Sequence, residues 1–484
     1  MSTPVTRAPA SRWWALALIA AAQFMVIMDT SIIGVALPKM QTDLGFTPQN
    51  LSWVFNAYVV AFGGLLLLGG RLSDLFGARR IFSIGWAVLA TGSLAAGLAD
   101  SVAVELVGRA VQGAGAALIA PSALTLLFTL FGSTPKELTR ALALYGAAAP
   151  AGGTAGVFLG GVLTEYASWP WVFFINIPLA VAVLLLTPAV MPAGMRRQGS
   201  LDLVGAATVT TGLAAVVYAV VQAPEAGWGS PTTLVAGLGG LTLLAVFVAV
   251  QRAVREPLMR LGIWRAPDLA AANIAQLMLA AAWIPMFFFV NLYLQQVLGL
   301  GAFASGAALL PLTVTIMVGM IVAAPRLMAR FGPRAMTVAG LGTLAAGLVW
   351  LSLIRPDGSF WVDVLPASLV TAAGMAMAFI PSLGTALSAV APEEGGLASG
   401  IVNTSYQVGS ALGLAAMTAL AAVYGADQVG DRVALTDGFS VALLGAAVIA
   451  AAGALLSALL LGRHRAASTT PSTGNDPVTA GTTR

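Results

Sequence analysis

Long apolar runs recur along the whole of this 484-residue sequence and constrain its fold more than any other feature. A helix needs about 20 apolar residues to cross the hydrocarbon core of a bilayer. Only 9% of the residues are charged, against about 25% in soluble domains. The sequence therefore predicts an all-α integral membrane protein. Fourteen candidate spans lie at 13–36, 50–70, 81–99, 102–129, 140–163, 172–191, 201–222, 232–251, 268–297, 304–324, 336–354, 363–388, 398–424 and 438–461.

The basic residues collect in alternate loops. If the first span starts on the cytoplasmic side, 19 of the 23 lysines and arginines lie in segments that share that side. Cytoplasmic loops of membrane proteins carry such an excess. Both termini are therefore predicted to be cytoplasmic. The pI of 9.7 follows from this distribution and calls for no nucleic-acid partner.

A short polar segment, Gly70–Arg80, separates the second and third apolar runs and has a weaker copy 255 residues later. Repeats of this kind predict two related halves, each with a basic loop between helices. The copy has Ala329 where the first segment has Asp74, so the halves are not equivalent. The matching residues are Arg71 with Arg326, Leu72 with Leu327, Phe76 with Phe331, Gly77 with Gly332, and Arg79 with Arg334.

The repeat and the order of the predicted spans together divide the chain into five parts. We expect a cytoplasmic tail at 1–12, a six-helix bundle at 13–191 and an inserted helix pair with its loops at 192–267. A second six-helix bundle is expected at 268–462. The segment 463–484, rich in Ser, Thr and Pro, is predicted to be a disordered cytoplasmic tail.

Several kinds of chemistry are excluded by residue usage. The chain has no cysteine, and its one histidine, His464, lies in the polar tail. Disulfides, thiolate metal sites and histidine catalysis inside the membrane are therefore not expected. The only lysines, Lys39 and Lys136, each follow a proline, so no phosphate-binding Gly-Lys loop exists and no nucleotide is expected.

Four segments in order carry a resemblance: Met28–Pro38, Gly70–Arg80, Arg109–Gly115 and Trp169–Pro178. Together they resemble the motifs of the major facilitator superfamily, and of its fourteen-helix drug:proton antiporter branch, over residues 12–462. The resemblance implies two six-helix bundles plus an inserted pair, efflux of drugs, and the proton as the only coupling ion, with no other cofactor. It also implies a conformational latch at Gly70, Arg71, Asp74, Gly77, Arg79 and Arg80.

Asp74 could reach a helix N-terminus or an arginine, and a solvated loop carboxylate is the alternative. In the fifth span, Gly152, Gly156 and Gly160 recur every four residues, followed by Gly161. Such spacing allows helices to approach closely. The resemblance places this face where the two halves meet, and ordinary helix packing is the alternative. Three residues depart from the branch's motifs: Gly34 replaces Asn, Pro170 replaces Arg, and Val157 replaces Pro.

Asp29 is the one carboxylate well inside a span. A carboxylate in hydrocarbon is costly, and its neutral, proton-carrying form is favoured there. Arg109 is the only basic residue within a span, at a similar depth of about 12–14 Å. It could pair with Asp29, or with Glu105 one turn earlier on its own helix. We expect Asp29, Arg109 and Glu105 to be the proton-coupling candidates, with a purely structural Asp29 as the alternative.

Scattered polar and aromatic residues predict a wide, weakly selective cavity, although some of them could simply pack. We expect a monomeric transporter in the bacterial plasma membrane that exports small hydrophobic molecules, cationic or neutral, in exchange for protons. The alternatives are a metabolite or nutrient transporter, a polytopic membrane enzyme and a non-transporting sensor. The cavity candidates are Asn56, Tyr58, Gln112, Gln276, Trp283, Asn291, Tyr293, Asn403, Tyr406 and Gln407.

Overall fold

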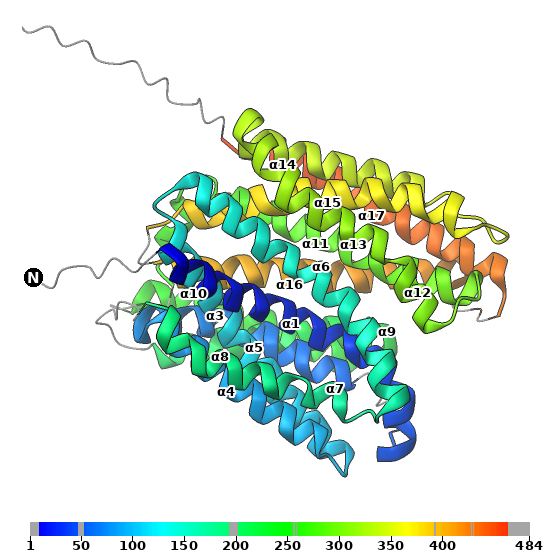
Figure 1. Ribbon diagram of the computed structural model, residues 1–484, viewed down its shortest axis with the longest axis horizontal. Helices are drawn as coiled ribbons and strands as arrows, with labels where there is room; N and C mark the ends of the chain where they lie inside the picture. Colours follow the sequence, from blue (N-terminus) through cyan, green and yellow to red (C-terminus); the bar gives the residue numbers. More distant parts are fainter. Residues whose placement is uncertain are drawn as a thin grey trace, which may run out of the picture.

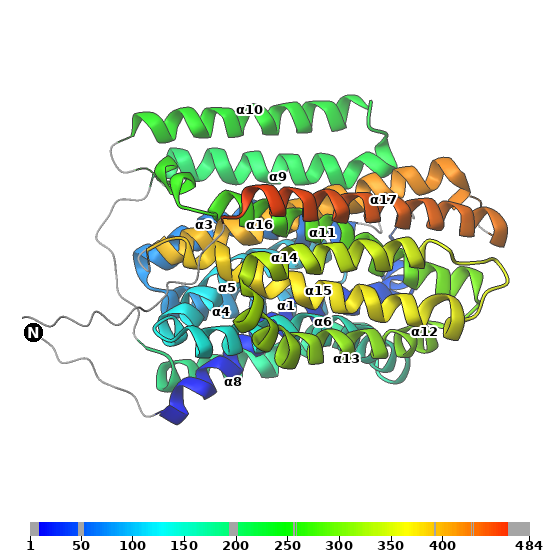
Figure 2. The same cartoon turned by 90° about the horizontal axis from the view of Figure 1, so that it is seen from above.

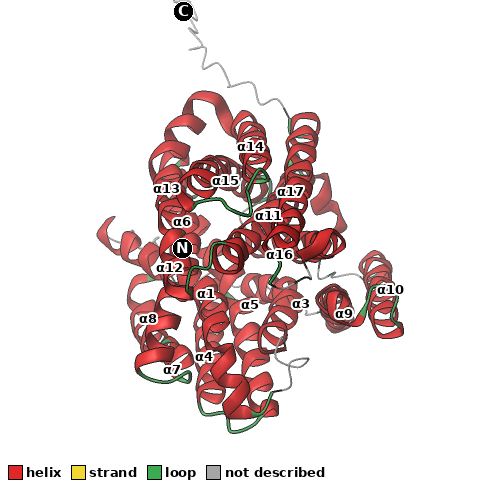
Figure 3. Ribbon diagram, turned by 90° about the vertical axis from the view of Figure 1, so that its right-hand side faces the viewer, coloured by secondary structure: helices red, strands yellow, loops and turns green. Residues whose placement is uncertain are grey.

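The computed structural model describes residues 9–46, 53–192, 202–254, 257, 259–391, 394–426, 428 and 430–462. Every regular element in these ranges is a helix, and they contain no strand (Figure 3). Twelve helical stretches of the described residues are long and apolar enough to cross a membrane. One of these, Ala304–Leu351, covers two predicted spans, and a shorter apolar helix lies at Val204–Val220. The prediction of a multi-pass, all-helical membrane protein is confirmed, and the described residues contain about twelve to fourteen apolar helices.

The long helices lie side by side along the longest axis of the molecule (Figure 1). The first half contains α1 (Pro9–Leu44), α3 (Trp53–Phe76), α4 (Ala78–Gly97), α5 (Val102–Phe131), α6 (Pro135–Tyr166), α7 (Trp171–Phe174) and α8 (Asn176–Val190). Between the halves come α9 (Leu203–Ala226), α10 (Pro231–Ala253) and η1 (Leu261–Arg265). The second half contains α11 (Leu269–Leu292), η2 (Tyr293–Val297), α12 (Ala302–Ala308), α13 (Leu310–Val318), η3 (Gly319–Ala323), α14 (Ala324–Leu351), η4 (Phe360–Val364), α15 (Leu365–Ser388), α16 (Gly395–Ala421), η6 (Ala422–Ala426) and α17 (Arg432–Leu460).

The two halves repeat the same helix pairings. In the first half α1 packs on α6, and α5 packs on α3 and α4. In the second half α11 packs on α16, and α15 packs on α13 and α14. The contact between α4 and α8 likewise has its counterpart between α14 and α17. The internal repeat predicted from the two loops is therefore present in the helix packing.

The pair α9 and α10 lies at the side of the molecule (Figures 2 and 3). Helix α9 packs on α3 and α16, one from each half, while α10 packs mainly on α9. The outer face of α10 is apolar and exposed, with Val235 73% and Leu238 63% exposed. Such a face suits lipid contact. An apolar groove of about 360 Å³ lies where α9 meets α3 and α5, between Trp53 and Thr210.

The loop predicted at Gly70–Arg80 is almost entirely helical. Helix α3 continues to Phe76 and α4 begins at Ala78, so Arg71 and Asp74 lie on a helix. Gly77 alone interrupts the helix. Its φ is 90°, a conformation that glycine adopts at little cost. The predicted loop was too long because polar residues at the end of a span can remain helical.

The second copy has the same form. Helix α14 is kinked at Gly332, where φ is 79° and Pro333 follows, so the two predicted spans join across one glycine. Elsewhere α1 begins at Pro9, inside the predicted tail, and the sixth span divides into α7 and α8. Residues 193–201 and the tail at 463–484 lie outside the described residues.

Candidate functional site

A buried ion pair joins α1 to α5. Arg109 Nη1 donates to Asp29 Oδ2 at 2.7 Å, and both side chains are fully buried. The sequence left Asp29 and Glu105 open as partners of Arg109. The structure forms the pair with Asp29, and Glu105 takes part in no ion pair with the described residues.

The second oxygen of Asp29 is also bound. Its Oδ1 accepts hydrogen bonds from Gln112 Nε2 at 3.1 Å and from Asn176 Nδ2 at 2.7 Å. Both amides also donate to Ser93 Oγ, at 2.8 and 3.0 Å. The network thus joins α1, α4, α5 and α8. Charge-assisted hydrogen bonds of this kind stabilise an ionised carboxylate.

Two members of this network are absent from the sequence-based prediction, and one was assigned elsewhere. Asn176 lies in the Trp169–Pro178 segment, so its motif was a signal that could have found it. Ser93 gave no signal, because it is a single serine in a span rich in Ala and Gly. Gln112 was predicted to line a cavity; in this structure it is instead fully buried and bonded to Asp29.

The rest of the Arg109 guanidinium is enclosed by backbone and aromatic rings. Its Nε donates to the Val54 carbonyl oxygen at 2.9 Å. The guanidinium carbon lies 4.7 Å from the centre of the Tyr58 ring and 5.9 Å from that of Phe173, distances at which a cation is attracted to a ring face. Tyr58 was also predicted to line the cavity. It is only 1% exposed and instead covers the buried cation.

Glu105 lies one turn before Arg109 on α5 and is fully buried. Neither of its carboxyl oxygens has a hydrogen-bond partner among the described residues. Among all the residues that the structure describes, no group of three or more His, Cys, Asp or Glu residues could hold a metal ion.

Asp74 connects the two halves. Its Oδ1 accepts from the Gly396 N–H at 2.8 Å, and its Oδ2 from the Leu397 N–H at 2.9 Å. These amides begin α16, and a carboxylate at a helix N-terminus is stabilised by the unpaired N–H groups and the helix dipole. The alternative of a solvated loop carboxylate does not fit this geometry. Helix α3 is in the first half and α16 in the second, so one side chain links the halves.

Glycines bring α3 and α16 close enough for this link. A Cβ atom on Gly70 would overlap the Gly396 carbonyl oxygen. A Cβ on Gly396 would overlap Asp74 Oδ1 and lie 2.6 Å from the Gly70 carbonyl oxygen. Only glycine fits at either position, so Gly70 allows α3 and α16 to pack closely where they cross.

The arginines of this segment have different surroundings. Arg79, in the first turn of α4, donates from Nη1 to the Met191 carbonyl oxygen at 3.3 Å, just beyond the end of α8. A cation near a helix C-terminus is favourable. Arg71 is half-buried near the end of α3, and Arg80 is exposed.

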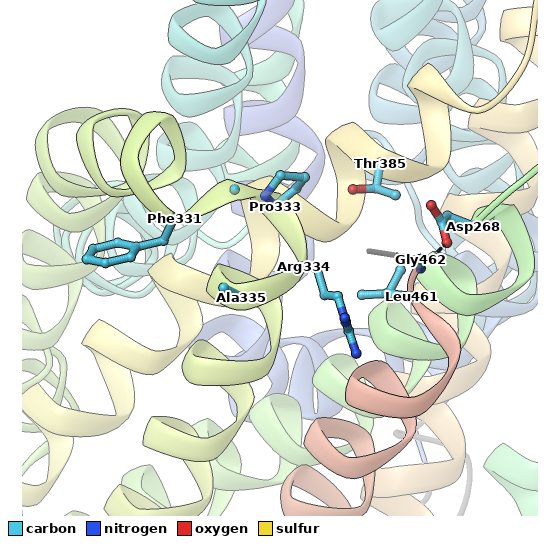
Figure 4. A pocket seen from close by; sticks show the side chains of 9 residues that line it. Asp268, Phe331, Pro333, Arg334, Ala335, Thr385, Leu461 and Gly462 are labelled. Atoms are coloured by element: carbon cyan, nitrogen blue, oxygen red, sulfur yellow. Dashed lines mark hydrogen bonds between the residues drawn. The ribbon is translucent and has the colours of Figure 1, made fainter. Parts of the chain in front are cut away.

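The second copy repeats the arginine contact without the carboxylate. Arg334 Nη2 donates to the Ala458 carbonyl oxygen in the last turn of α17. Figure 4 shows Arg334 pointing toward the end of α17, beside a cavity of about 230 Å³. Across this cavity, Asp268 Oδ1 accepts from the Gly462 N–H at 2.5 Å. Ala329, at the position of Asp74, is exposed.

The glycine row of α6 faces a neighbour within its own half. Cβ atoms on Gly152, Gly156 and Gly160 would meet the backbone carbonyl oxygens of Phe24, Met28 and Ile32 of α1. The prediction that this face lies between the halves is therefore wrong. The spacing of small residues predicts that another helix packs closely, but it does not identify that helix. Gly161 has open space beside it.

A different face of α6 meets the second half. The hydroxyl groups of Thr154 and Thr313 lie 2.5 Å apart, between α6 and α13. Nearer the start of α6, a Cβ on Gly146 would approach Ile380 and Phe379 of α15. Gly146 and Thr154 therefore lie at the contact between the halves.

Two of the predicted cavity residues lie near this contact. Gln276 donates to the Phe379 carbonyl oxygen at 3.2 Å and to Ser382 Oγ at 3.1 Å. The Phe379 ring packs edge-on against Tyr406, with centroids 5.9 Å apart. Because Phe379 also lies beside Gly146 of α6, Gln276 and Tyr406 are close to the contact between the halves.

The remaining candidates do not form one lining. Tyr293 is 1% exposed and donates to the Arg355 carbonyl oxygen at 2.6 Å, and so anchors a loop. Trp283 is buried in the core. Asn403 donates within its own helix, to the Ser399 carbonyl oxygen at 2.9 Å. Asn291, Asn56 and Gln407 are half-buried.

Comparison with known proteins identifies the family. The sequence profile of the Major Facilitator Superfamily matches residues 19–414. The chain is 39% identical to the cephamycin export protein CmcT of Amycolatopsis lactamdurans, over 92% of each chain. It is 38% identical to the puromycin resistance protein pur8 of Streptomyces alboniger, over 88% of this chain and 86% of that protein.

Solved structures agree with the fold. The human organic anion transporter MFSD10 superposes with a TM-score of 0.66 at 15% identity, covering 93% of this chain and all of that one. The proton:xylose symporter XylE superposes with a TM-score of 0.66 at 14% identity, covering 94% of this chain and 97% of that one. These identities support the fold alone. With the family profile spanning most of its length, this chain belongs to the Major Facilitator Superfamily and is a membrane transporter, not an enzyme.

Proposed function

We propose that this transporter is a proton-coupled exporter of hydrophobic drugs or antibiotics from the bacterial cytoplasm, working by alternating access. The names of its relatives support export: cephamycin export for one, and puromycin resistance for another. A third relative, 33% identical, is the tetracenomycin C resistance and export protein of Streptomyces glaucescens. The observation that carries the proton coupling is the fully buried Asp29–Arg109 pair.

The coupling follows from two states of Asp29. While the carboxylate is ionised, it holds Arg109, Gln112 and Asn176 and so connects the three helices α1, α5 and α8. Taking up a proton removes the charge that these donors stabilise, so the packing of α1 against α5 and α8 changes. A proton and a drug that bias the same two conformations in opposite directions are thermodynamically coupled. The drug then leaves when the proton binds.

Asp74 is the proposed latch of the outward-facing conformation. In the proposed topology, both termini and the α3–α4 turn are cytoplasmic, and the chain belongs to the fourteen-helix branch. Asp74 then joins α3 to the start of α16 on the cytoplasmic side. The contact must break for the cavity to open inward. Gln276 and Tyr406, close to the contact between the halves, are proposed to touch the drug. The protein acts as a monomer, with the proton as its only coupling ion.

A transport assay tests this proposal. Inside-out vesicles from a strain lacking its own drug pumps would be given a pH gradient with an acidic lumen. We expect uptake of at least one compound from a panel of puromycin, a cephamycin and tetracenomycin C, and its loss when the gradient is collapsed. Uptake of none of these, or uptake indifferent to the gradient, contradicts the proposed function.

A further inference from the structure

The Glu105 carboxyl group is buried in apolar surroundings and forms no ion pair with the described residues. It is fully buried at the start of α5, and both oxygens lack hydrogen-bond partners among the described residues. Its helix neighbours Val102 and Leu106 pack against an apolar cluster that includes Trp169 and Phe173. An ionised carboxylate is strongly disfavoured in such surroundings. These surroundings favour the protonated form of Glu105.

A second unsatisfied group lies one helical turn away. The Arg109 guanidinium uses Nη1 for Asp29 and Gln112 and Nε for Val54. Its Nη2 is buried and has no acceptor among the described residues. Side chains four residues apart on a helix face the same side, so Nη2 and Glu105 are positioned to meet.

The charges around this point are few. Asp29 comes from α1, Arg109 and Glu105 from α5, and the phenol of Tyr58 from α3. The polar groups that α4 and α8 contribute are the neutral Ser93 and Asn176. One guanidinium thus lies near two carboxyl groups and is paired with only one of them, Asp29. If Asp29 alone took up a proton, Arg109 would be left as an uncompensated buried charge, which is strongly destabilising.

We propose that Glu105 is a second proton-binding group and that Arg109 exchanges Asp29 for Glu105 during transport. This inference rests on the proposed proton coupling. An O–H bond breaks at Glu105 and one forms at Asp29, while Arg109 moves to the new carboxylate. During this exchange the trio keeps one proton and zero net charge. Asp29 then releases its proton to the cytoplasm, Glu105 takes another from the outer side, and Arg109 returns to Asp29.

Infrared spectroscopy of the purified, full-length protein in liposomes tests the exchange without transport. The unchanged protein should show a carbonyl stretch of a protonated carboxyl group that is missing in Glu105→Gln. In Asp29→Asn, Arg109 has lost its anion and should draw Glu105 into an ionised pair, so this band should disappear. Glu137→Gln is the control, because Glu137 pairs with Arg12 at a partly exposed site, and the band should remain. A Glu105 band unchanged in Asp29→Asn overturns the inference.

Transport gives an independent reading. In Glu105→Gln, Arg109 has no second anion, so Asp29 stays ionised until the outside is more acidic. We expect the external pH of half-maximal export to fall by about one unit or more. Glu105→Leu, which replaces a carboxyl group that has no hydrogen bonds to the described residues, should shift the profile in the same direction. This variant covers the case in which the glutamine variant folds poorly. Unshifted profiles in both variants contradict the role of Glu105. Absence of gradient-driven export in the unchanged protein contradicts the proposed function instead, and the infrared result still decides the exchange.

Discussion

The α3–α4 turn and its counterpart in α14 have the same local form but different connections. Each bends at a glycine of positive φ, Gly77 or Gly332. Each places an arginine on a carbonyl oxygen at or just beyond the end of the last helix of its own half, Arg79 on Met191 and Arg334 on Ala458.

Only the first copy adds a contact to the other half. Asp74 accepts two hydrogen bonds from the start of α16, whereas Ala329 is exposed and has no group that could do so. The shared features therefore hold each half together, and the unequal one connects the halves. A latch on one copy alone stabilises one conformation of the transport cycle over the other.

Among changes in the two copies, removing the Asp74 charge should have the largest effect on transport. Asp74→Asn keeps the shape but loses charge-assisted bonds worth about 1.5–3 kcal/mol each. Loss of even one shifts the balance between the two conformations about tenfold or more. We expect drug export to fall about tenfold at unchanged protein level, measured in vesicles. Export at the unchanged rate would mean that the α16 contact is not a latch.

The two bend glycines should behave alike, because both copies need them. Gly77→Ala and Gly332→Ala place a Cβ on a backbone conformation that costs on the order of 1–3 kcal/mol. An added Cβ at Gly332 meets no atom within 4 Å, so strain alone should lower stability there. Thermal unfolding of the detergent-solubilised variants should show losses of similar size. A large loss in one half only would break the equivalence of the two bends.

The paired arginines should give a smaller and again symmetrical effect. Arg79→Ala and Arg334→Ala each remove a cation from a helix C-terminus, an interaction worth about 0.3–1 kcal/mol. Thermal unfolding should detect both, with export at most mildly reduced. If Arg79→Ala abolished export while Arg334→Ala did not, Arg79 would belong to the latch and not to the shared support.

Adding the missing carboxylate should change least. Ala329 is exposed, and exposed substitutions usually change stability by less than about 0.5 kcal/mol. Ala329→Asp should therefore leave export within about twofold of the unchanged protein in the same vesicle assay. A loss comparable to that of Asp74→Asn would show that the second copy also controls the conformational balance.

The sequence predicts the pairing of Asp29 with Arg109 better than it predicts their surroundings. Both residues lie at a similar depth, and depth follows from counting residues along a helix. Ser93 and Asn176 could not be placed in the same way. Helices that are apolar all round give no periodicity to show which face looks inward.

The glycines show a similar limit. The four-residue spacing of Gly152, Gly156 and Gly160 predicts a close approach, yet the neighbour is α1 and not the second half. Tyr58 and Gln112 were assigned to a cavity but contact the buried ion pair in this structure, because a polar side chain in a span can stabilise a buried charge as well as bind a ligand. Only the positions of the neighbouring helices show whether such a side chain stabilises a buried charge or faces a ligand.

The most direct test of the account is gradient-driven export by Asp29→Asn. The asparagine nearly preserves the shape of the side chain but cannot carry a proton at physiological pH. In inside-out vesicles with an acidic lumen, uptake should fall to background, while exchange of labelled for unlabelled drug without a gradient continues. Glu137→Gln, at the partly exposed pair with Arg12, should retain full uptake. Full gradient-driven uptake by Asp29→Asn would contradict the claim that Asp29 carries the coupled proton.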